Sequence, residues 1–417
     1  MFNDSLLPYY NKVQIGKEKR KRPYYDIILF LMLISSNLGE TAAIGRIKLS
    51  WLFGFMLFLS ISLIYYKDTY YFFINNSSKK ACLIFVIFWL SYALIQSLFS
   101  MNRALSFKFL IIVAINCLII FTVIIQSKTV SDALFYNKAM ILSLLINIII
   151  AVWEIRTGNH VVKLDTENDI LFYSKMPHGV FGNVNDFATF LYFGIISIFI
   201  DIIYNHRHYL YKIVLIIVSL LLIILTNSRA VLYGSLAFLL LFPIIYYLIN
   251  HLQKGIFELL PIVGSFLIIL VLSKYPLYEI IDRFSSSGNR ESDLLRLDLI
   301  KKSFEVFIRS FLLGAGPGQS TNYLGTNPHN FFLEILADYG LIIFTGVSIM
   351  LLIIFYSFLK IRNTKLASLN ISFCISFLLV SISSSSANRI RATWIIISIL
   401  LSLVFSQKET IKVSRSE

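Results

Sequence analysis

The stretch that organises this chain runs from Ser285 to Gly340 and reads SSSGNRESDLLRLDLIKKSFEVFIRSFLLGAGPGQSTNYLGTNPHNFFLEILADYG. It is the longest tract without an apolar run of membrane length, and hydrophobic segments flank it on both sides. It contains Arg296, a turn rich in glycine, and His329. We therefore expect the rest of the chain to form a hydrophobic frame around this stretch.

The composition indicates a membrane protein. Of the 417 residues, 57% are hydrophobic and only 14% are charged. Apolar runs of about 18 residues or more recur along the chain, which is typical of helices that cross a bilayer. A soluble core of this size would not need so many unbroken runs.

We expect an all-α polytopic membrane protein with about 12 transmembrane helices and a large extracytoplasmic loop that contains an amphipathic helix. The predicted spans are 26–43, 49–66, 81–99, 109–126, 139–153, 187–204, 211–225, 231–249, 256–273, 331–359, 366–384 and 393–405. They form a single transmembrane domain, residues 26–406, between a basic cytoplasmic tail at 1–25 and a second cytoplasmic tail at 407–417. The large outer loops are expected at about 154–186 and 274–330.

Basic residues set the orientation, because Lys and Arg next to a span are retained on the cytoplasmic side. The cluster KEKRKR at 17–22 precedes the first span and places the N-terminus in the cytoplasm. An even number of spans returns the C-terminal tail to the same side. The net charge of +14 then follows largely from topology, so a nucleic-acid partner is not required.

Several arginines fall on the outer side against this trend. Arg229 is the most informative, because it lies in TNSRA, a very short outer turn between two hydrophobic helices. A guanidinium at that depth usually has an anionic partner. The alternative is an arginine that extends to the membrane interface without a ligand. Arg389 and Arg391 also lie outside.

The long outer loop is predicted to contain an amphipathic helix. Apolar residues recur at three- and four-residue steps, with charged residues between them, from Leu297 to Phe311. Arg296 lies in the first turns of this helix. The helix should end at LLGAGPG, where Gly316 and Gly318 permit unusual backbone angles and would expose amide groups toward a ligand. A simple helix stop is the alternative.

His329 is the candidate general base. It belongs to the segment NPHN, directly before the apolar run that begins at Phe331. Proline and asparagine end regular structure, so the imidazole should lie at the mouth of the next helix. An imidazole titrates near neutrality and can accept a proton from a hydroxyl group. A capping cluster that includes Asn330 is the structural alternative, and His178 is the rival base.

The earlier outer loop ends in GNVNDFATF, residues 182–190. Asn185 or Asp186 could cap the helix that follows. Alternatively, Asn183, Asn185 and Asp186 line the outer cavity and hold sugar hydroxyl groups. We find no DxD-like pair, no HExxH motif and no outer Cys/His cluster, so no metal site is expected.

Four stretches together resemble the O-antigen ligase and O-antigen polymerase superfamily of bacterial membrane glycosyltransferases. They are GNVNDFATF (182–190), SRA (228–230), RLDLIKKSFEVFIRSFLLGAGPG (296–318) and HNFFLEILADYGLI (329–342). The resemblance covers about 179–343. Phe311 departs from it, because the superfamily usually has a proline before Leu-Leu-Gly.

The resemblance implies two essential arginines and one essential histidine that face the periplasm. By position these are Arg229, Arg296 and His329. It also implies transfer of a glycan from a polyprenyl diphosphate to an acceptor hydroxyl at the outer face of the bacterial cytoplasmic membrane. The arginines would hold the diphosphate, with Arg389 or Arg391 as helpers, and neither a metal nor a cofactor would be needed.

Three functions stay open at this point. The favoured one is a polymerase of capsule, exopolysaccharide or O-antigen repeat units, and the next is a ligase that transfers the glycan to lipid A core or another surface acceptor. A flippase or transporter of lipid-linked oligosaccharide is the alternative from another class, although we detect no internal repeat of the kind many transporters show. Expected partners are the lipid-linked donor, a glycan or lipid acceptor and membrane lipids, with a flippase and a chain-length regulator as further candidates.

Overall fold

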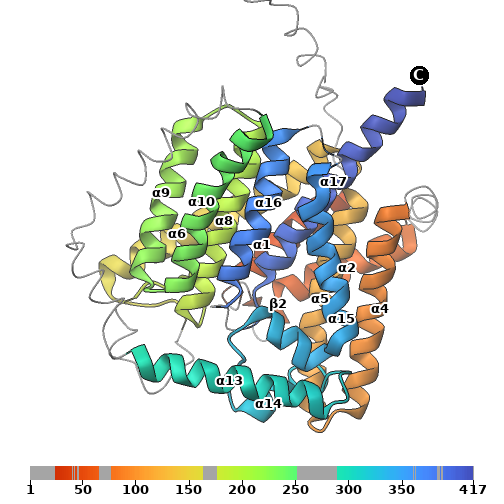
Figure 1. The fold of residues 1–417 in the computed structure, drawn as a ribbon, viewed down its shortest axis with the longest axis vertical. Helices are drawn as coiled ribbons and strands as arrows, with labels where there is room; N and C mark the ends of the chain where they lie inside the picture. The colour runs from red at the N-terminus through yellow and green to blue at the C-terminus, as the bar shows by residue number, and fades with distance from the viewer. Residues whose placement is uncertain are drawn as a thin grey trace, which may run out of the picture.

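The chain folds into a bundle of long, roughly parallel helices, with one amphipathic helix lying across one end (Figure 1). The computed structural model describes residues 24–39, 41, 43–44, 47–64, 77–162, 176–250, 289–359, 361, 363–382, 386 and 388–416. The predicted span at 256–273 and the middle of the predicted outer loop at 154–186 lie outside these residues.

The described elements are almost all helical. The helices are α1 (Tyr24–Asn37), α2 (Leu49–Ile64), α4 (Ser77–Phe99), α5 (Arg103–Gln126), α6 (Val130–Thr157), α8 (Val184–Tyr204), α9 (Tyr209–Leu225), α10 (Arg229–Asn250), α13 (Asn289–Arg309), α14 (Gln319–Leu324), α15 (Phe331–Phe355), the 3-10 helix η3 (Tyr356–Leu359), α16 (Thr364–Val380) and α17 (Arg391–Ser416). Strands β1 (Ala43–Ile44) and β2 (Ile47–Lys48) pair antiparallel, a small departure from the expected all-α fold.

The hydrophobic helices confirm a multi-pass membrane protein. Six described helices (α4, α5, α6, α8, α10 and α15) are long and apolar enough to cross a membrane. Five shorter apolar stretches lie in α1, α2, α9, α16 and α17. The predicted number of twelve spans stays a prediction, since 256–273 is not among the described residues.

Asparagine side chains fix where several helices begin. Asn102, Asn330 and Asn363 each accept a hydrogen bond from a backbone amide in the first turn of the following helix. Asn183 caps α8 by accepting from the amide of Asn185 at 2.8 Å. The cap of α8 is therefore Asn183, and the predicted capping role of Asn185 or Asp186 is wrong.

Aromatic side chains fill the centre of the bundle. The Trp89 ring packs edge-on against Tyr339 and Trp394, with ring centroids 5.7 and 5.1 Å apart. Phe331 packs on Trp394 at 5.5 Å. These contacts join α4, α15 and α17, and buried polar pairs such as Tyr192 and Ser376 at 2.6 Å join further helices.

Helix α15 is broken, which corrects the continuous span predicted for 331–359. Gly340 has φ +75° and ψ −172°, so the helical path is interrupted one-third of the way along. The helix then ends at Phe355, and η3 follows. A glycine inside an apolar run tolerates this backbone conformation, which other residues adopt at a cost.

Several segments predicted to face outward meet at one end of the bundle, which we name the α13 end. There Asn102, before α5, exchanges hydrogen bonds with Gln319 of α14. The amide of Phe331 donates to the carbonyl of Ser381 at 2.9 Å. The helix predicted around 297–311 is present as α13, which ends at Arg309 and packs on α15 and α14. Phe307 of the predicted apolar face is buried, whereas Leu297, Ile300, Phe304 and Phe311 are exposed.

Candidate functional site

The N-terminus of α10, the C-terminus of α16 and the N-terminus of α15 converge at the α13 end. Helices α10 and α16 touch closely, because a Cβ atom on Gly234 would lie 2.4 Å from Val380 of α16. The next residue, Ser381, accepts the hydrogen bond from Phe331 at the start of α15. This chain of contacts brings the turn before α10 and the segment before α15 to the same part of the molecule.

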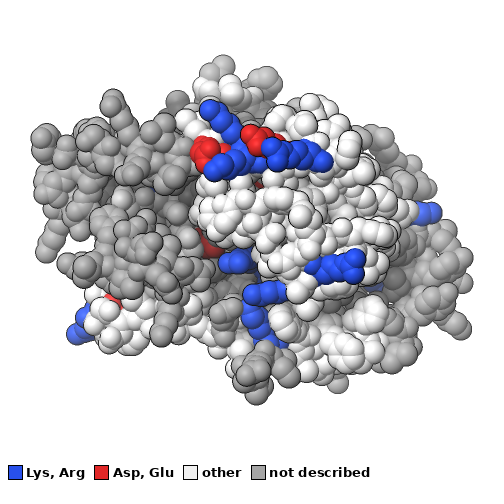
Figure 2. Space-filling view, turned by 90° about the horizontal axis from the view of Figure 1, so that it is seen from below, with Lys and Arg blue, Asp and Glu red and all other residues white. Residues whose placement is uncertain are grey.

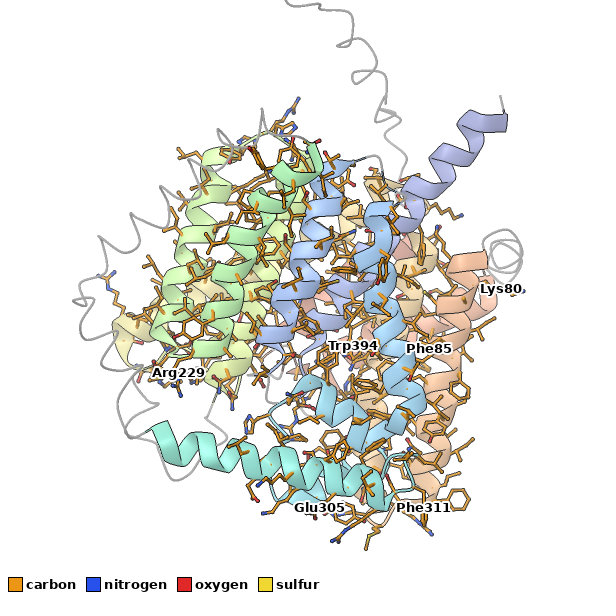
Figure 3. The ribbon with its side chains drawn as sticks, viewed as in Figure 1. Lys80, Phe85, Arg229, Glu305, Phe311 and Trp394 are labelled. Carbon is orange, nitrogen blue, oxygen red and sulfur yellow. The ribbon has the colours of Figure 1, made fainter. Side chains whose placement is uncertain are left out.

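Arg229 and His329 belong to these two segments. Arg229 is the first residue of α10, is partly buried, and lies at the lower end of α10 in Figure 3. His329 is also partly buried and has φ +51°, an uncommon conformation for a residue other than glycine. The structure thus places both predicted catalytic residues at the α13 end.

Asn330 has a defined structural task beside His329. Its side-chain oxygen accepts hydrogen bonds from the amides of Phe332 and Leu333, at 3.0 and 3.1 Å. This is the capping role named above as the structural alternative. The cap fixes the start of α15, and with it the backbone that carries His329.

Helix α13 carries Arg296 across this end of the bundle. The structure describes the backbone at this position, within the first half of the helix. The described charged side chains of α13 are all exposed, namely Asp298, Lys301, Lys302, Glu305 and Arg309. Figure 2 looks onto the α13 end and shows several groups of basic side chains, with acidic ones mostly beside one group. Most of the face is uncharged, and the charged side chains coloured on it are mainly basic, which favours an anionic ligand.

The glycine turn is held by Asp338 of α15. The amide of Gly318 donates to Asp338 Oδ2 at 2.9 Å, and the amide of Ser320 donates to Oδ1 at 2.8 Å. The amide of Gly316 donates to the Asp338 carbonyl at 2.8 Å. The expectation that the amides of Gly316 and Gly318 face a ligand is therefore wrong, because the protein itself uses them.

The glycine turn and the break in α15 are in close backbone contact at two glycines. A Cβ on Gly314 would lie 2.4 Å from the backbone nitrogen of Gly340, and a Cβ on Gly340 would lie 2.3 Å from the carbonyl carbon of Leu313. Real Cβ atoms do not approach backbone so closely, so only glycine fits at either position. Gln96 of α4 adds a hydrogen bond to the Leu313 carbonyl at 2.8 Å.

A second buried carboxylate of α15 holds the segment between α16 and α17. Glu334 Oε1 accepts from the Ser386 hydroxyl at 2.8 Å and from the Asn388 amide at 2.7 Å. The other side-chain atom of Asn388, its Oδ1, accepts from the Tyr339 hydroxyl at 3.0 Å. Sequence reasoning missed Glu334 and Asp338, although acidic residues inside an apolar helix are themselves a signal of such a role.

Arg389 and Arg391 differ in accessibility. Arg389 is exposed and lies over the Phe109 ring, 5.7 Å from its centroid. The same ring packs against Gly318, where a Cβ would lie 2.4 Å from it. Arg391 is buried, and its guanidinium donates to the Ser36 carbonyl at 3.2 Å. Arg389 is therefore an exposed residue next to the glycine turn, whereas Arg391 connects α17 to α1.

The segment between α6 and α8, predicted to be an outer loop, holds a cluster that sequence reasoning missed. Glu154, His160 and His178 offer ligand atoms that all lie within 4.8 Å of one another. The sequence predicted no such cluster, yet these three side chains lie together; whether a metal binds there stays a prediction. No motif spacing marks these residues, because two of them precede, and one follows, the middle of a long loop.

His178 is a weaker candidate for the general base than His329. Its side chain is 0% exposed, so an acceptor hydroxyl does not reach it. Burial lowers the pKa of His178 below its ordinary value, the Glu154 carboxylate opposes that shift, and His160 adds to it. His178 thus belongs to the loop cluster and not to the site around His329.

Two comparisons with known proteins bear on this arrangement. Residues 213–348 match the O-antigen ligase family. The chain is also 26% identical, over 356 residues, to the teichuronic acid biosynthesis protein TuaE of Bacillus subtilis (strain 168), an alignment that covers 78% of this chain and 72% of that protein. The resemblance to the O-antigen ligase and polymerase superfamily is confirmed.

The region that matches the family contains the three residues predicted to be catalytic. Residues 213–348 include Arg229, Arg296 and His329, together with the glycine turn and both buried carboxylates of α15. The match begins in α9 and ends in the second part of α15. The loop cluster at Glu154 lies before it.

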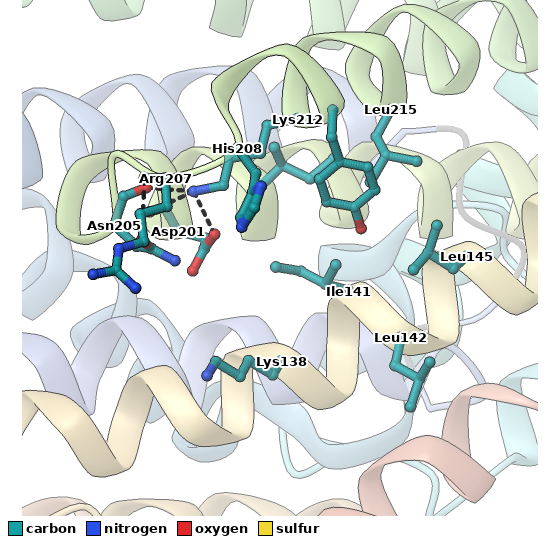
Figure 4. A pocket seen from close by; sticks show the side chains of 12 residues that line it. Lys138, Ile141, Leu142, Leu145, Asp201, Asn205, Arg207, His208, Lys212 and Leu215 are labelled. Atoms are coloured by element: carbon teal, nitrogen blue, oxygen red, sulfur yellow. Dashed lines mark hydrogen bonds and ion pairs between the residues drawn. The ribbon is translucent and has the colours of Figure 1, made fainter.

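A cavity of about 430 Å³ lies at the other end of α8, between α6, α8 and α9 (Figure 4). Its polar lining residues are Lys138, Asp201, Asn205, Arg207, His208, Tyr211 and Lys212. Lys212 pairs with Asp201 at 2.6 Å and also donates to the Asn205 carbonyl. None of the site residues predicted from the sequence lines this cavity, so it is separate from the site at the α13 end.

Proposed function

We propose that this protein is a membrane glycosyltransferase that transfers a polyprenyl-diphosphate-linked glycan to an acceptor hydroxyl at the outer face of the bacterial cytoplasmic membrane. The acceptor is another lipid-linked repeat unit, so the product is a longer chain of a surface polysaccharide. The observation that carries the proposal is the gathering of Arg229, helix α13 with Arg296, and His329 at one end of the bundle, within the region that matches the O-antigen ligase family.

The reaction exchanges one bond for another at the anomeric carbon of the donor sugar. The acceptor oxygen forms the new bond to this carbon, while the bond from the carbon to the diphosphate oxygen breaks and its electron pair leaves with the polyprenyl diphosphate. His329 accepts the proton of the acceptor hydroxyl. Arg229 and Arg296 bind the diphosphate, whose negative charge grows as the bond breaks. No metal is assigned to these steps.

Arginine suits this leaving group better than lysine does. A guanidinium is planar, stays charged at any accessible pH, and can donate two parallel hydrogen bonds to phosphate oxygens. Arg389, exposed beside the Phe109 ring, is the third group that we assign to the diphosphate. Arg391 holds α17 against α1, so its role is to position that segment.

The proposed sugar-binding residues divide into two groups. Asn183 and Asn330 cap α8 and α15, and Gly316 and Gly318 are bound to Asp338, so these four position the site. Asn185 and Asp186 begin α8 at the same end, and we assign them to the sugar hydroxyl groups.

The role of the relative favours polymer assembly over ligation. TuaE of Bacillus subtilis is described as a teichuronic acid biosynthesis protein, which is a role in building a polymer. A ligase that transfers the finished glycan to lipid A core or another surface acceptor is the second candidate. Both enzymes would use the same donor chemistry and differ in the acceptor.

A flippase of lipid-linked oligosaccharide is the candidate from another class. Transporters place their substrate site near the middle of the membrane, between repeats of the fold. Here the candidate residues lie at helix ends, which favours a reaction at one surface. Under our proposal a flippase supplies the donor as a separate partner, and a chain-length regulator acts on the product.

The test uses purified protein in liposomes with a polyprenyl-diphosphate-linked repeat unit as the sole glycan. We expect a ladder of longer lipid-linked glycans. A ligase would leave the repeat unit unchanged until a lipid A core or other acceptor is added. Transfer of unchanged lipid-linked glycan between leaflets, without any new glycosidic bond, would show a flippase and overturn the proposal.

A further inference from the structure

We propose that Glu154, His160 and His178 form a binding site for a divalent transition metal, with Zn²⁺ as the best-matched ion, that fastens the loop after α6 to the loop before α8. The site is distinct from the proposed glycosyl-transfer site. Its predicted role is to stabilise the fold of this loop.

The three side chains come from both ends of the loop. Glu154 lies in the last turn of α6, and His160 follows the C-cap, Gly158. His178 lies in the short segment before α8. The two imidazole rings stack with centroids 4.3 Å apart and planes 20° from parallel. The Nδ1 atoms of both rings lie close to the Glu154 carboxylate.

The distances suit a small tetrahedral ion. Glu154 Oε1 lies 3.3 Å from His160 Nδ1 and 3.8 Å from His178 Nδ1. Zinc bonds of about 2.0–2.1 Å to nitrogen and oxygen require ligand atoms about 3.3 Å apart in a tetrahedral site. The pair Glu154–His160 already has this separation. Binding requires the stacked imidazole of His178 to turn and bring its Nδ1 closer to the other two ligand atoms.

The carboxylate is already held in place from its other oxygen. Glu154 Oε2 accepts hydrogen bonds from the amides of His178 and Gly179, at 2.9 and 2.8 Å. Oε1 has no hydrogen-bond donor among the described residues and lies toward the imidazoles. Metal-bound carboxylates are commonly oriented by hydrogen bonds of this kind.

His178 is a second observation that favours a ligand at this position. Its side chain is 0% exposed, and neither ring nitrogen makes a hydrogen bond of full geometry with the described residues, although the Phe181 backbone lies nearby. Buried polar groups normally have a partner, since an unsatisfied one costs free energy. A metal ion on Nδ1 would supply that partner.

The donor set selects the class of ion. Two imidazoles and one carboxylate are ligands typical of zinc and its neighbours, whereas calcium prefers six or more oxygen atoms. His160 is 17% exposed, which leaves an approach for the ion and room for a water molecule as the fourth ligand. Imidazole binds a metal in its neutral form, so zinc binding should weaken as the pH falls.

Asn147, a second side chain of α6, holds the same loop. Gly179 has φ +58°, and a Cβ there would lie 2.9 Å from Asn147 Oδ1. The amide of Val180 also donates to Asn147 Oδ1, at 3.3 Å. Two side chains of α6 therefore fix the segment that leads to the cap of α8. A metal ion bound to Glu154 would also connect His160, on the other side of the loop, to this segment.

The test is direct zinc binding by the full-length protein, purified in detergent with an affinity tag that contains no histidine. After treatment with a chelator, the protein is titrated with Zn²⁺ and bound metal is measured by mass spectrometry. We expect about one zinc per chain and a rise in the thermal unfolding temperature on binding. Glu154→Gln and His160→Ala should each weaken zinc binding by more than about tenfold.

Glu154→Gln is the sharpest variant. Its amide oxygen can still accept from His178 and Gly179, so the loop attachment is kept while the anionic ligand is lost. His206→Ala removes an exposed histidine between α8 and α9 and serves as the matched control. The proposal fails if the wild-type protein takes up no zinc at tens of micromolar, or if Glu154→Gln and His160→Ala bind zinc as tightly as wild type and His206→Ala. Because the readout is metal content, it is independent of glycosyl transfer.

Discussion

The amide of Gly318 donates a hydrogen bond of 2.9 Å to the carboxylate of Asp338, and so joins the glycine turn to helix α15. The second oxygen of the same carboxylate accepts from the amide of Ser320. Asp338 is fully buried, so both bonds are shielded from water. The carboxylate therefore sets the position of the turn relative to the start of α15.

Replacing Asp338 should separate these two elements. In Asp338→Asn an NH₂ group would face one of the two backbone amides, which leaves a buried donor without an acceptor. We expect a loss of about 1–3 kcal/mol in stability. Thermal unfolding in detergent measures it, with the exposed Asp298→Asn as control. Equal unfolding temperatures for Asp338→Asn and wild type would contradict this role.

The close backbone contact between Gly314 and Gly340 predicts that alanine has unequal effects at three glycines that all have positive φ. Gly314→Ala and Gly340→Ala place a Cβ on backbone atoms at 2.4 and 2.3 Å, and we expect neither protein to accumulate folded in the membrane. Gly325 has φ +73° with nothing within 4 Å of its Cβ position, so Gly325→Ala should cost only the strain of about 1–2 kcal/mol. Folded protein is counted by size-exclusion chromatography. Similar yields for all three variants would refute this contact.

The proposed arginines should be needed for transfer and not for folding. Arg229→Ala and Arg296→Ala should insert at normal levels but make no long glycan, because the leaving diphosphate loses its counter-charge. Even Arg229→Lys should be strongly impaired, since an ammonium cannot make the paired hydrogen bonds. Glycan length and membrane abundance are measured together.

Arg309→Ala is the matched control for Arg296→Ala. Arg309 lies on the same helix, is 83% exposed, and pairs only loosely with Glu305 at 3.7 Å. Its loss should leave glycan length unchanged. If Arg296→Ala behaves like Arg309→Ala, Arg296 does not bind the diphosphate.

His329→Ala should separate catalysis from donor binding. Loss of a positioned general base costs about a hundred- to ten-thousand-fold in rate, whereas binding of the lipid-diphosphate donor should be retained. Transfer and donor binding are measured on the same preparation, with His206→Ala as control. Loss of donor binding in a folded His329→Ala protein would instead assign His329 to the diphosphate, and Asp186 would become the next candidate base.

The orientation of the bundle is testable with introduced cysteines. Asn322, at the α13 end, and His206, at the opposite end, are both exposed. In intact cells without an outer permeability barrier, a membrane-impermeant maleimide should label Asn322→Cys and not His206→Cys. The unmodified protein measures the background labelling of the native cysteines. Labelling of His206→Cys alone would place the α13 end in the cytoplasm and remove the outer-face site.

Most of the hydrophobic helices could be predicted from the sequence. A backbone in lipid must satisfy its own hydrogen bonds, so long apolar runs form helices. The amphipathic pattern around 297–311 also predicted α13, since its charged residues recur on a helical period. The break at Gly340 could not be predicted. A glycine in an apolar run reads as a small helical residue, and only the contact with Gly314 shows why the helix is interrupted.

The hydrogen bonds that hold the site together could not be predicted from the sequence for a different reason. The sequence shows Glu334 and Asp338 only as parts of an apolar helix, because their partners are backbone amides and side chains of separate segments. The turn was expected to offer its amides to a ligand, yet a buried carboxylate takes them. In the cluster of Glu154, His160 and His178, contact depends on how the loop returns to α6, and no local spacing encodes that return.

The backbone contact between Gly314 and Gly340 determines how this chain can be recombined with its relatives. A recombination breakpoint between the two glycines would combine one parent's turn with the other parent's helix at a contact that leaves no room for a single extra methyl group. Breakpoints on either side of residues 310–340 would move both halves of the contact together. Chimeras built to exchange glycan specificity should therefore inherit this block from one parent only.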